Sequence, residues 1–150
     1  MNYEKLNAQL RIDEGRRYRR YLDTANPPRW TIGDGHNITD DPHYPYTEAD
    51  EPLTDDQIDG LRNRDVAVAV MALDQYANWW RAMDEPRQRV LANMCFNMGW
   101  KKLSEFVNTL QAMHFAKYDI AAFGMRSSKW ANQVGDRAER LAKIMETGEG

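Results

Sequence analysis

The first residues of the chain place apolar side chains at the spacing of one helix face. The members of this stripe are Tyr3, Leu6, Leu10 and Ile12. Gly15 stands where a helix commonly ends in a left-handed residue, because glycine adopts that conformation without steric cost. The pattern predicts a helix that runs to about Glu14.

Between residues 16 and 38 the pattern changes to that of short strands. Aromatic and β-branched residues favour strands here, namely Tyr18, Tyr21, Trp30, Thr31 and Ile32. Residues 26–28, which include Pro27 and Pro28, and the run from Gly33 to Gly35 are turn signals. We expect a small β-hairpin or three-stranded sheet, followed by an irregular, proline-rich loop over residues 40–52.

A capping box predicts the start of a long helix after this loop. Thr54 and Gln57 stand three residues apart, as the two partners of such a box do. The helix continues to about Ala77 and is therefore about 34 Å long, enough to bridge two lobes. Valine and alanine alternate over residues 66–70 and would also fit a strand, but the cap and the length favour a helix.

The remainder of the chain carries helix signals only. Asp84 is placed to cap a helix that holds Pro86 in its first turn and ends at Gly99. The later predicted helices cover about residues 106–115, 119–125 and 136–145. Because strands are confined to the first third of the chain, the predicted fold class is α+β.

Composition is that of one ordinary domain. The chain has 150 residues, of which 42% are hydrophobic, so it can form a core without a metal or a disulfide. The single cysteine, Cys95, lies in the apolar stretch 90–98 and is predicted to be an inert core residue rather than a nucleophile.

Apolar runs give no sign of a membrane segment. The longest, residues 66–73, is too short to span a bilayer, and residues 1–11 lack the hydrophobic stretch of a signal peptide. We therefore expect a soluble protein without a signal peptide, made in a cytoplasm.

Charge is distributed unevenly along the chain. The net charge is −3, yet residues 30–61 carry nine acidic residues and no lysine or arginine. This segment is equally consistent with a solvated loop that aids solubility and with a functional surface. The low isoelectric point and the scatter of basic residues argue against nucleic-acid binding.

Two carboxylates are candidates for acid–base chemistry. Glu14 lies in the last turn of the first predicted helix, and Asp23 lies beside the predicted hairpin. Cleavage of a glycosidic bond needs one carboxylic acid to protonate the leaving oxygen and a second carboxylate to activate water or stabilise the cationic sugar. A single glutamate is more often a solvated surface residue, so this spacing alone is weak evidence.

The segment around Glu14 belongs to a longer motif. It comprises Leu10 to Gly15, Tyr21, Asp23, Thr24 and Thr31 to His36. Together these residues resemble the catalytic region of the phage-type lysozymes, or endolysins. The resemblance continues through residues 54–70 and 93–99, Phe106, Asn108, and residues 128–133 and 136–138. Nearly the whole chain is covered.

The resemblance implies a lysozyme-like, two-lobed α+β fold within a single domain of residues 1–150. The first helix and a small β-sheet lobe would occupy residues 1–53, and the helix between the lobes would occupy residues 54–77. A mostly helical lobe would follow over residues 78–150.

The implied activity is that of a muramidase. Such an enzyme cleaves the β-1,4 bond between N-acetylmuramic acid and N-acetylglucosamine in peptidoglycan and lyses the host cell. Glu14 matches the family's essential glutamate, Asp23 its aspartate and Thr31 its water-positioning threonine. The family inverts the sugar configuration, so Glu14 would donate a proton while a water held by Asp23 and Thr31 attacks. An inverting site holds its two carboxyl groups about 6.5–9.5 Å apart.

Arg137 matches an arginine that pairs with the catalytic glutamate in the family. A nearby cation favours an ionised carboxylate, whereas a general acid must be protonated. We therefore hypothesise that sugar entering the site weakens the pair between Glu14 and Arg137. A role as a structural anchor near a helix start is the alternative for Arg137.

Further residues match or neighbour family positions that bind substrate. His36 belongs to this set, although hydrogen bonding that fixes the hairpin is its favoured role. The others are Phe96, Asn97, Thr109 and Asn132. Phe96 is equally consistent with a core position. The tryptophans at positions 79, 80, 100 and 130 are predicted to be core anchors rather than sugar platforms.

The chain departs from the family pattern in three ways. Residues 26–29 contain two extra residues, which lengthen the segment between Asp23 and Thr31. The chain is acidic, whereas family members are commonly basic, so substrate binding should rely on the basic helical lobe. An acidic stretch over residues 43–52 replaces a plainer loop, and its purpose is not evident from the sequence.

Two other functions stay open at this point. One is a non-catalytic peptidoglycan-binding or phage-structural module. The other is a lytic transglycosylase, which would leave an anhydro sugar. The presence of Glu14, Asp23 and Thr31 together argues for hydrolysis.

The expected partner is the glycan strand of peptidoglycan, without nucleic-acid binding or stable membrane insertion. We expect no cofactor and no metal, because His36, His43 and His114 lack the paired spacing of metal ligands. We further expect a monomer that acts on the cell wall after release from the host cytoplasm through a membrane-pore (holin) protein.

Overall fold

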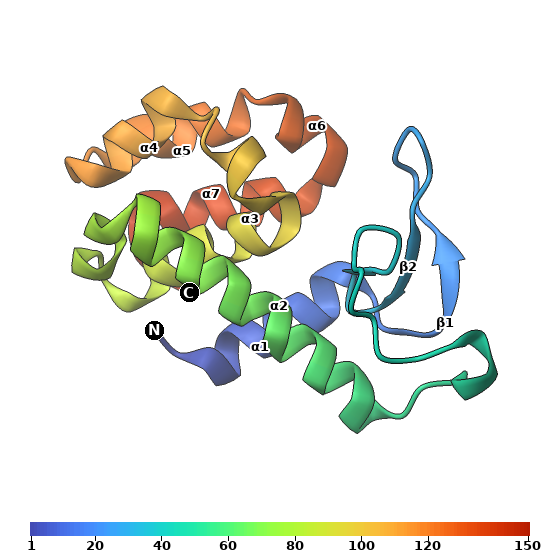
Figure 1. Cartoon of the computed structure of the whole chain (residues 1–150). Coiled ribbons are helices and arrows are strands. Elements are labelled where there is room, and N and C mark those ends of the chain that lie inside the picture. The colour runs from blue at the N-terminus through green and yellow to red at the C-terminus, as the bar shows by residue number, and fades with distance from the viewer. The chain divides into compact units, whose positions relative to one another are not determined.

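The computed structural model describes residues 1–150 and combines seven α-helices with one small sheet (Figure 1). The elements are α1 (Tyr3–Glu14), β1 (Arg17–Leu22), β2 (Trp30–Gly33), β3 (His36–Asn37), the 3-10 turn η1 (Glu48–Asp50), α2 (Asp55–Tyr76), the 3-10 turn η2 (Asn78–Ala82), α3 (Glu85–Leu103), α4 (Val107–His114), α5 (Tyr118–Arg126), α6 (Lys129–Val134) and α7 (Asp136–Thr147). The predicted α+β class is confirmed.

The chain forms two compact units. Residues 4–67 make up the sheet unit, and residues 1–3 together with residues 68–150 make up the helical unit. Helix α2 contributes residues to both units.

Helix α1 supports the sheet unit with a narrower apolar stripe than the sequence predicts. Leu6 and Leu10 are fully buried, whereas Tyr3 is 46% and Ile12 is 79% exposed. The spacing correctly predicts a helix to Glu14, but only two of the four apolar residues face the core. Gly15 ends the helix with a φ of +68°, as predicted.

Strands β1, β2 and β3 form an antiparallel sheet in that order, which confirms the predicted three-stranded sheet. In the register, Tyr21 of β1 lies opposite Thr31 of β2, and Ile32 lies opposite His36 of β3. The turn between β2 and β3 contains Gly33 and Gly35, both with positive φ.

A small core holds the sheet against the first half of α2. Its buried members are Ile32, Leu53, Ile58 and Leu61, and Ile38, Tyr44 and Tyr46 pack at its edge. The predicted capping box is confirmed: the Thr54 backbone N–H donates to Gln57 Oε1 at 2.9 Å, and the Gln57 N–H donates to Thr54 Oγ1 at 3.1 Å.

The helical unit is organised around α7, which packs against α3, α5 and α6. Leu141, Ile144 and Met145 of α7 are buried, as their spacing predicts. Cys95 is also buried, which confirms its predicted core position. Trp80 and Trp130 are buried, as predicted for core anchors, whereas Trp79 and Trp100 are half-buried and stack on His114 and Tyr76. No helix of the structure has the length and apolarity that crossing a membrane requires.

The structure differs from the predicted helices in three respects. Asp84 occupies the cap position of α3, but its carboxylate accepts a hydrogen bond from Arg87 Nη1 at 3.0 Å instead of capping the backbone. Gly99 breaks the helical geometry at φ +77°, and a further turn continues to Leu103. Helix α6 lies outside the predicted helices, because its six residues are too few to produce a periodic sequence pattern.

Candidate active site

Glu14 is the last residue of α1, and its carboxylate lies directly against the turn between β2 and β3. A methyl group built on Gly35 would lie 2.7 Å from Glu14 Oε2 and 2.9 Å from Glu14 Cδ. Gly35 has a φ of +79°, which also favours glycine. The absent side chain at position 35 therefore leaves the space that the Glu14 carboxylate occupies.

Asp23 follows β1, and its carboxylate is fixed by three hydrogen bonds. Oδ1 accepts from the backbone N–H groups of Ala25 at 3.1 Å and Arg29 at 2.8 Å. Oδ2 accepts from Arg29 Nε at 3.1 Å. Burial alone would raise the pKa of Asp23, but these hydrogen bonds outweigh it and hold that pKa below its ordinary value. The group is an anion at neutral pH.

Thr31 lies on β2 and is buried. Its hydroxyl donates to the backbone oxygen of Arg29 at 3.1 Å. The backbone N–H of Asp23 donates to the same oxygen at 2.9 Å. Asp23 and Thr31 are thus joined through one carbonyl group, in the same unit as Glu14.

Tyr21 is a residue of this region for which the sequence motif predicts no role. Burial raises the pKa of its phenol, and the negative charges of Glu14 and Asp23 add to that effect, while Arg17 opposes it. The Arg17 guanidinium lies 4.4 Å from the centre of the Tyr21 ring. The signal in the sequence is the position of Tyr21 in β1, two residues before Asp23.

A buried ion pair joins the end of α1 to the turn between β2 and β3. Arg16 donates through Nε to Asp34 Oδ1 at 2.9 Å and through Nη2 to Asp34 Oδ2 at 2.7 Å. Arg62 of α2 reaches Asp34 Oδ2 at 3.3 Å, and the Asp34 side chain is fully buried. Arg16 stands two residues after Glu14, and Asp34 immediately precedes Gly35. The pair therefore ties the end of α1 to the turn on which Glu14 rests.

His36 of β3 is buried between two carboxylates. Nδ1 lies 2.7 Å from Asp65 Oδ2 of α2, and Nε2 lies 2.9 Å from Asp41 Oδ2. Burial lowers the pKa of His36, but the two carboxylates outweigh burial and raise it above its ordinary value. The ring also stacks on Tyr44 at 5.7 Å between centroids. These contacts attach β3 to α2, and a role in substrate binding stays a prediction.

The remaining predicted residues lie in the helical unit. Asn97 accepts a hydrogen bond from Trp130 Nε1 at 2.8 Å, Phe96 is half-buried, and Asn132 is exposed. Arg137 is buried and donates to Asn93 Oδ1 through Nε at 3.0 Å and Nη2 at 2.8 Å. Its predicted pairing with Glu14 stays a prediction.

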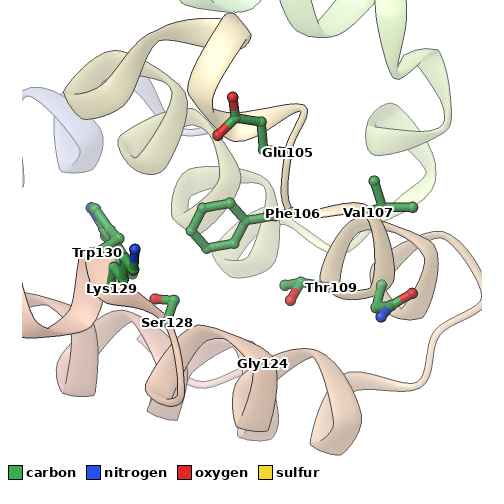
Figure 2. A pocket seen from close by; sticks show the side chains of 9 residues that line it. Glu105, Phe106, Val107, Thr109, Gly124, Ser128, Lys129 and Trp130 are labelled. Carbon is green, nitrogen blue, oxygen red and sulfur yellow. The ribbon is translucent and has the colours of Figure 1, made fainter.

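Thr109 lines a pocket of about 470 Å³ within the helical unit. Figure 2 shows the Phe106 ring directed toward Ser128, Lys129 and Trp130. The lining residues are Glu105, Phe106, Val107, Asn108, Thr109, Gly124, Ser128, Lys129 and Trp130. The lining combines an aromatic wall with hydroxyl and amide groups, a combination suited to a polar, partly apolar ligand such as a sugar or a peptide. No group of three or more His, Cys, Asp or Glu side chains is arranged to hold a metal ion.

The α+β fold, together with the family match and the named relatives, identifies this chain as a lysozyme-type hydrolase. Residues 11–144 match the phage lysozyme family, and the chain belongs to that family.

Two of the relatives span nearly all of the chain, and a third matches part of it. The chain is 27% identical to "Probable T4-type lysozyme 2" of Dictyostelium discoideum over 162 residues, which cover 95% of this chain and 94% of that protein. It is 31% identical to "Pre-baseplate central spike protein Gp5" of Enterobacteria phage T4 over 157 residues, which cover 93% of this chain and 27% of that protein. "Peptidoglycan hydrolase gp36" of Pseudomonas phage phiKMV is 42% identical over 55 residues, or 37% of this chain and 6% of that protein.

Proposed function

We propose that this chain hydrolyses the glycan strands of bacterial peptidoglycan. The bond broken is the β-1,4 bond between N-acetylmuramic acid and N-acetylglucosamine, with inversion at the anomeric carbon. The observation that carries the proposal is the placement of Glu14 in one compact unit with Asp23 and Thr31, the latter two joined through the Arg29 carbonyl. Family membership and a relative named as a peptidoglycan hydrolase support the substrate class.

Glu14 is the proposed general acid. In its protonated form it donates a proton to the glycosidic oxygen as the bond to the anomeric carbon breaks. Gly35 leaves room for the carboxylate without a competing side chain. The pair between Arg16 and Asp34 helps to hold that space, because it ties the residues that follow Glu14 to the turn that carries Gly35.

The attacking water is oriented by the direction of its hydrogen bonds. The Thr31 hydroxyl uses its only proton on the Arg29 carbonyl, so toward a water it can only accept. The ionised Asp23 carboxylate can likewise only accept. A water that donates one proton to each group presents its lone pairs to the anomeric carbon, and Asp23 can take up the proton released on attack.

The experiment that tests the proposal is digestion of purified peptidoglycan with product identification. Hydrolysis predicts reducing muramic ends, and proton NMR of a soluble glycan substrate during early turnover should show the α-anomer first. Anhydro-muramic ends would identify a transglycosylase, and the absence of new ends would identify a binding module. Either of these two results would refute the proposal.

Variants assign the roles of the residues. Glu14→Gln should abolish turnover while the thermal unfolding midpoint stays near that of the wild type. Glu4→Gln, an exposed carboxylate on the same helix, is the matched control and should retain activity. Asp23→Asn should lower kcat by about 10²–10⁴-fold, the usual cost of losing a positioned base.

A phage-structural setting is the second candidate, because one relative is named as a central spike protein. The same fold can serve as one domain of a larger assembly, and digestion separates a catalytic domain from a purely structural one. We further propose that the free chain is a monomer, that it acts on the cell wall after synthesis in the host cytoplasm, and that lysis depends on a pore protein. Sedimentation, and lysis timing with and without a pore-forming protein, test these points.

A further inference from the structure

The segment between Asp23 and Arg29 is closed into a ring at its base. The Asp23 N–H donates to the Arg29 carbonyl at 2.9 Å, and the Arg29 N–H donates back to Asp23 Oδ1 at 2.8 Å. The Arg29 side chain completes the contact with Asp23 Oδ2 at 3.1 Å. The extra residues of this segment, Pro27 and Pro28 among them, therefore lie in a loop whose ends meet at Asp23.

Arg29 forms hydrogen bonds with both groups proposed to hold the attacking water. Its carbonyl accepts the Thr31 hydroxyl, and its backbone and guanidinium groups each bind one oxygen of Asp23. Contacts to both oxygens limit rotation of a carboxylate about its Cβ–Cγ bond more tightly than contacts to one oxygen do. A fixed carboxylate presents the same lone pair to the water in every molecule.

The charges around Asp23 identify Arg29 as its main cationic neighbour. Arg29 faces Asp23 from the loop, and Tyr21 faces it from β1. Tyr21 in turn faces Glu14 and Arg17. The Arg29 side chain is 41% exposed and that of Asp23 is 23% exposed, so a bound water can reach the pair.

We propose that Arg29 is a positioning residue of the hydrolytic site, whose side chain holds the Asp23 carboxylate in one orientation and in its ionised form. The inference rests on the proposed function, because it assigns Arg29 a role through Asp23. Without the Arg29 side chain the two backbone N–H groups still bind Oδ1, but the carboxylate loses its one contact to Oδ2 and the neighbouring positive charge. The whole group then swings over a wider range and binds a proton more readily.

The first test measures the Asp23 carboxylate directly, without using activity. Carbon-detected NMR follows its titration in the wild type, Arg29→Gln, Arg29→Lys and Arg19→Gln, where Arg19 is an exposed control arginine on β1. The Asp23 midpoint should rise by roughly half a pH unit in Arg29→Gln, as expected for loss of a partly exposed ion pair. It should stay low in Arg29→Lys and Arg19→Gln. An unchanged midpoint in Arg29→Gln overturns the proposal.

The second test measures coupling in catalysis. Arg29→Gln should lower kcat about tenfold with little change in KM and move the acidic limb of the kcat profile to higher pH. Arg29→Lys should restore part of kcat. In an Asp23→Asn background the same Arg29→Gln change should have almost no effect, because the group through which Arg29 acts is gone. An equal loss in both backgrounds refutes the inference.

The two tests also separate failure of the inference from failure of the proposed function. Near-wild-type turnover of Asp23→Asn would remove the proposed catalytic role of Asp23, whatever the titration of Asp23 shows. A normal loss in Asp23→Asn together with an unmoved Asp23 midpoint in Arg29→Gln would remove only the role of Arg29.

Discussion

Replacement of Gly35 by alanine tests how closely the Glu14 carboxylate is held. The new methyl group would lie 2.7 Å from Glu14 Oε2, whereas ordinary contacts of such a group begin at 3.4 Å. The carboxylate is at the end of a flexible side chain, so it can move away to that distance at small cost in stability. The backbone is a separate source of strain, because Gly35 has a φ of +79°.

Backbone strain lowers the free energy of unfolding, whereas displacement of the Glu14 carboxylate lowers kcat. Left-handed alanine costs about 1–2 kcal/mol in the free energy of unfolding. A catalytic group displaced by a distance on the order of 1 Å costs about 10²-fold in rate. We therefore expect Gly35→Ala to fold, to lose about 1–2 kcal/mol in urea unfolding, and to lose about 10²-fold in kcat for peptidoglycan hydrolysis.

Gly15→Ala is the matched control, because Gly15 has a φ of +68° and nothing within 4 Å of the added methyl group. It should show a similar loss of stability and a much smaller loss of kcat. Gly60→Ala, at a helical position with open space around it, should raise stability by about 0.5–1 kcal/mol. Equal losses of kcat in Gly35→Ala and Gly15→Ala would show that backbone strain, and not crowding of Glu14, explains the effect.

Two further predictions concern titratable groups. The pKa of His36 is higher in the folded state than its ordinary value of 6.5. The contact of His36 with Asp41 and Asp65 should therefore contribute its full stabilisation of the fold below pH 6.5, and this stabilisation should be lost as the pH rises through the folded pKa. Urea unfolding of the wild type and His36→Asn between pH 5 and 9 should show a free-energy difference that shrinks as the pH rises, by about 1.4 kcal/mol for each pH unit that separates the folded from the unfolded pKa, and a constant difference would contradict this. Cys95 is buried, which raises its pKa to about 11, so a thiol reagent at neutral pH should label it only on unfolding. Rapid labelling of the native protein would refute that expectation.

Local features of the fold could be predicted because their causes lie within a few residues. The end of α1 at Gly15 follows from the conformational freedom of glycine, and the start of α2 follows from the reciprocal bonds of Thr54 and Gln57. Ile12 illustrates the limit of this reasoning. Its spacing fits the apolar stripe of α1, but burial depends on what packs against the helix, and Ile12 is exposed.

The candidate site was predictable as a set of residues and not as a set of contacts. Glu14, Asp23 and Thr31 follow from their matching motif, but nothing in the sequence indicates that one carbonyl joins the last two. The extra residues before Arg29 indicate only a lengthened turn. Their effect depends on how the loop closes in space, which brings the Arg29 side chain back onto Asp23.

The uneven charge of the chain has a structural cause that the sequence pattern conceals. Arginines in and just before β1 and acidic residues of segment 30–61 are each typical of a solvated surface, yet they form ion pairs with one another. Arg16 pairs with Asp34 and Asp59, and Arg20 pairs with Glu51, whose side chain is 2% exposed. A buried charge is tolerated only beside a counter-charge, and removing one member of such a pair typically costs about 3–5 kcal/mol. The acidic segment therefore supplies the counter-charges for the arginines that follow Glu14.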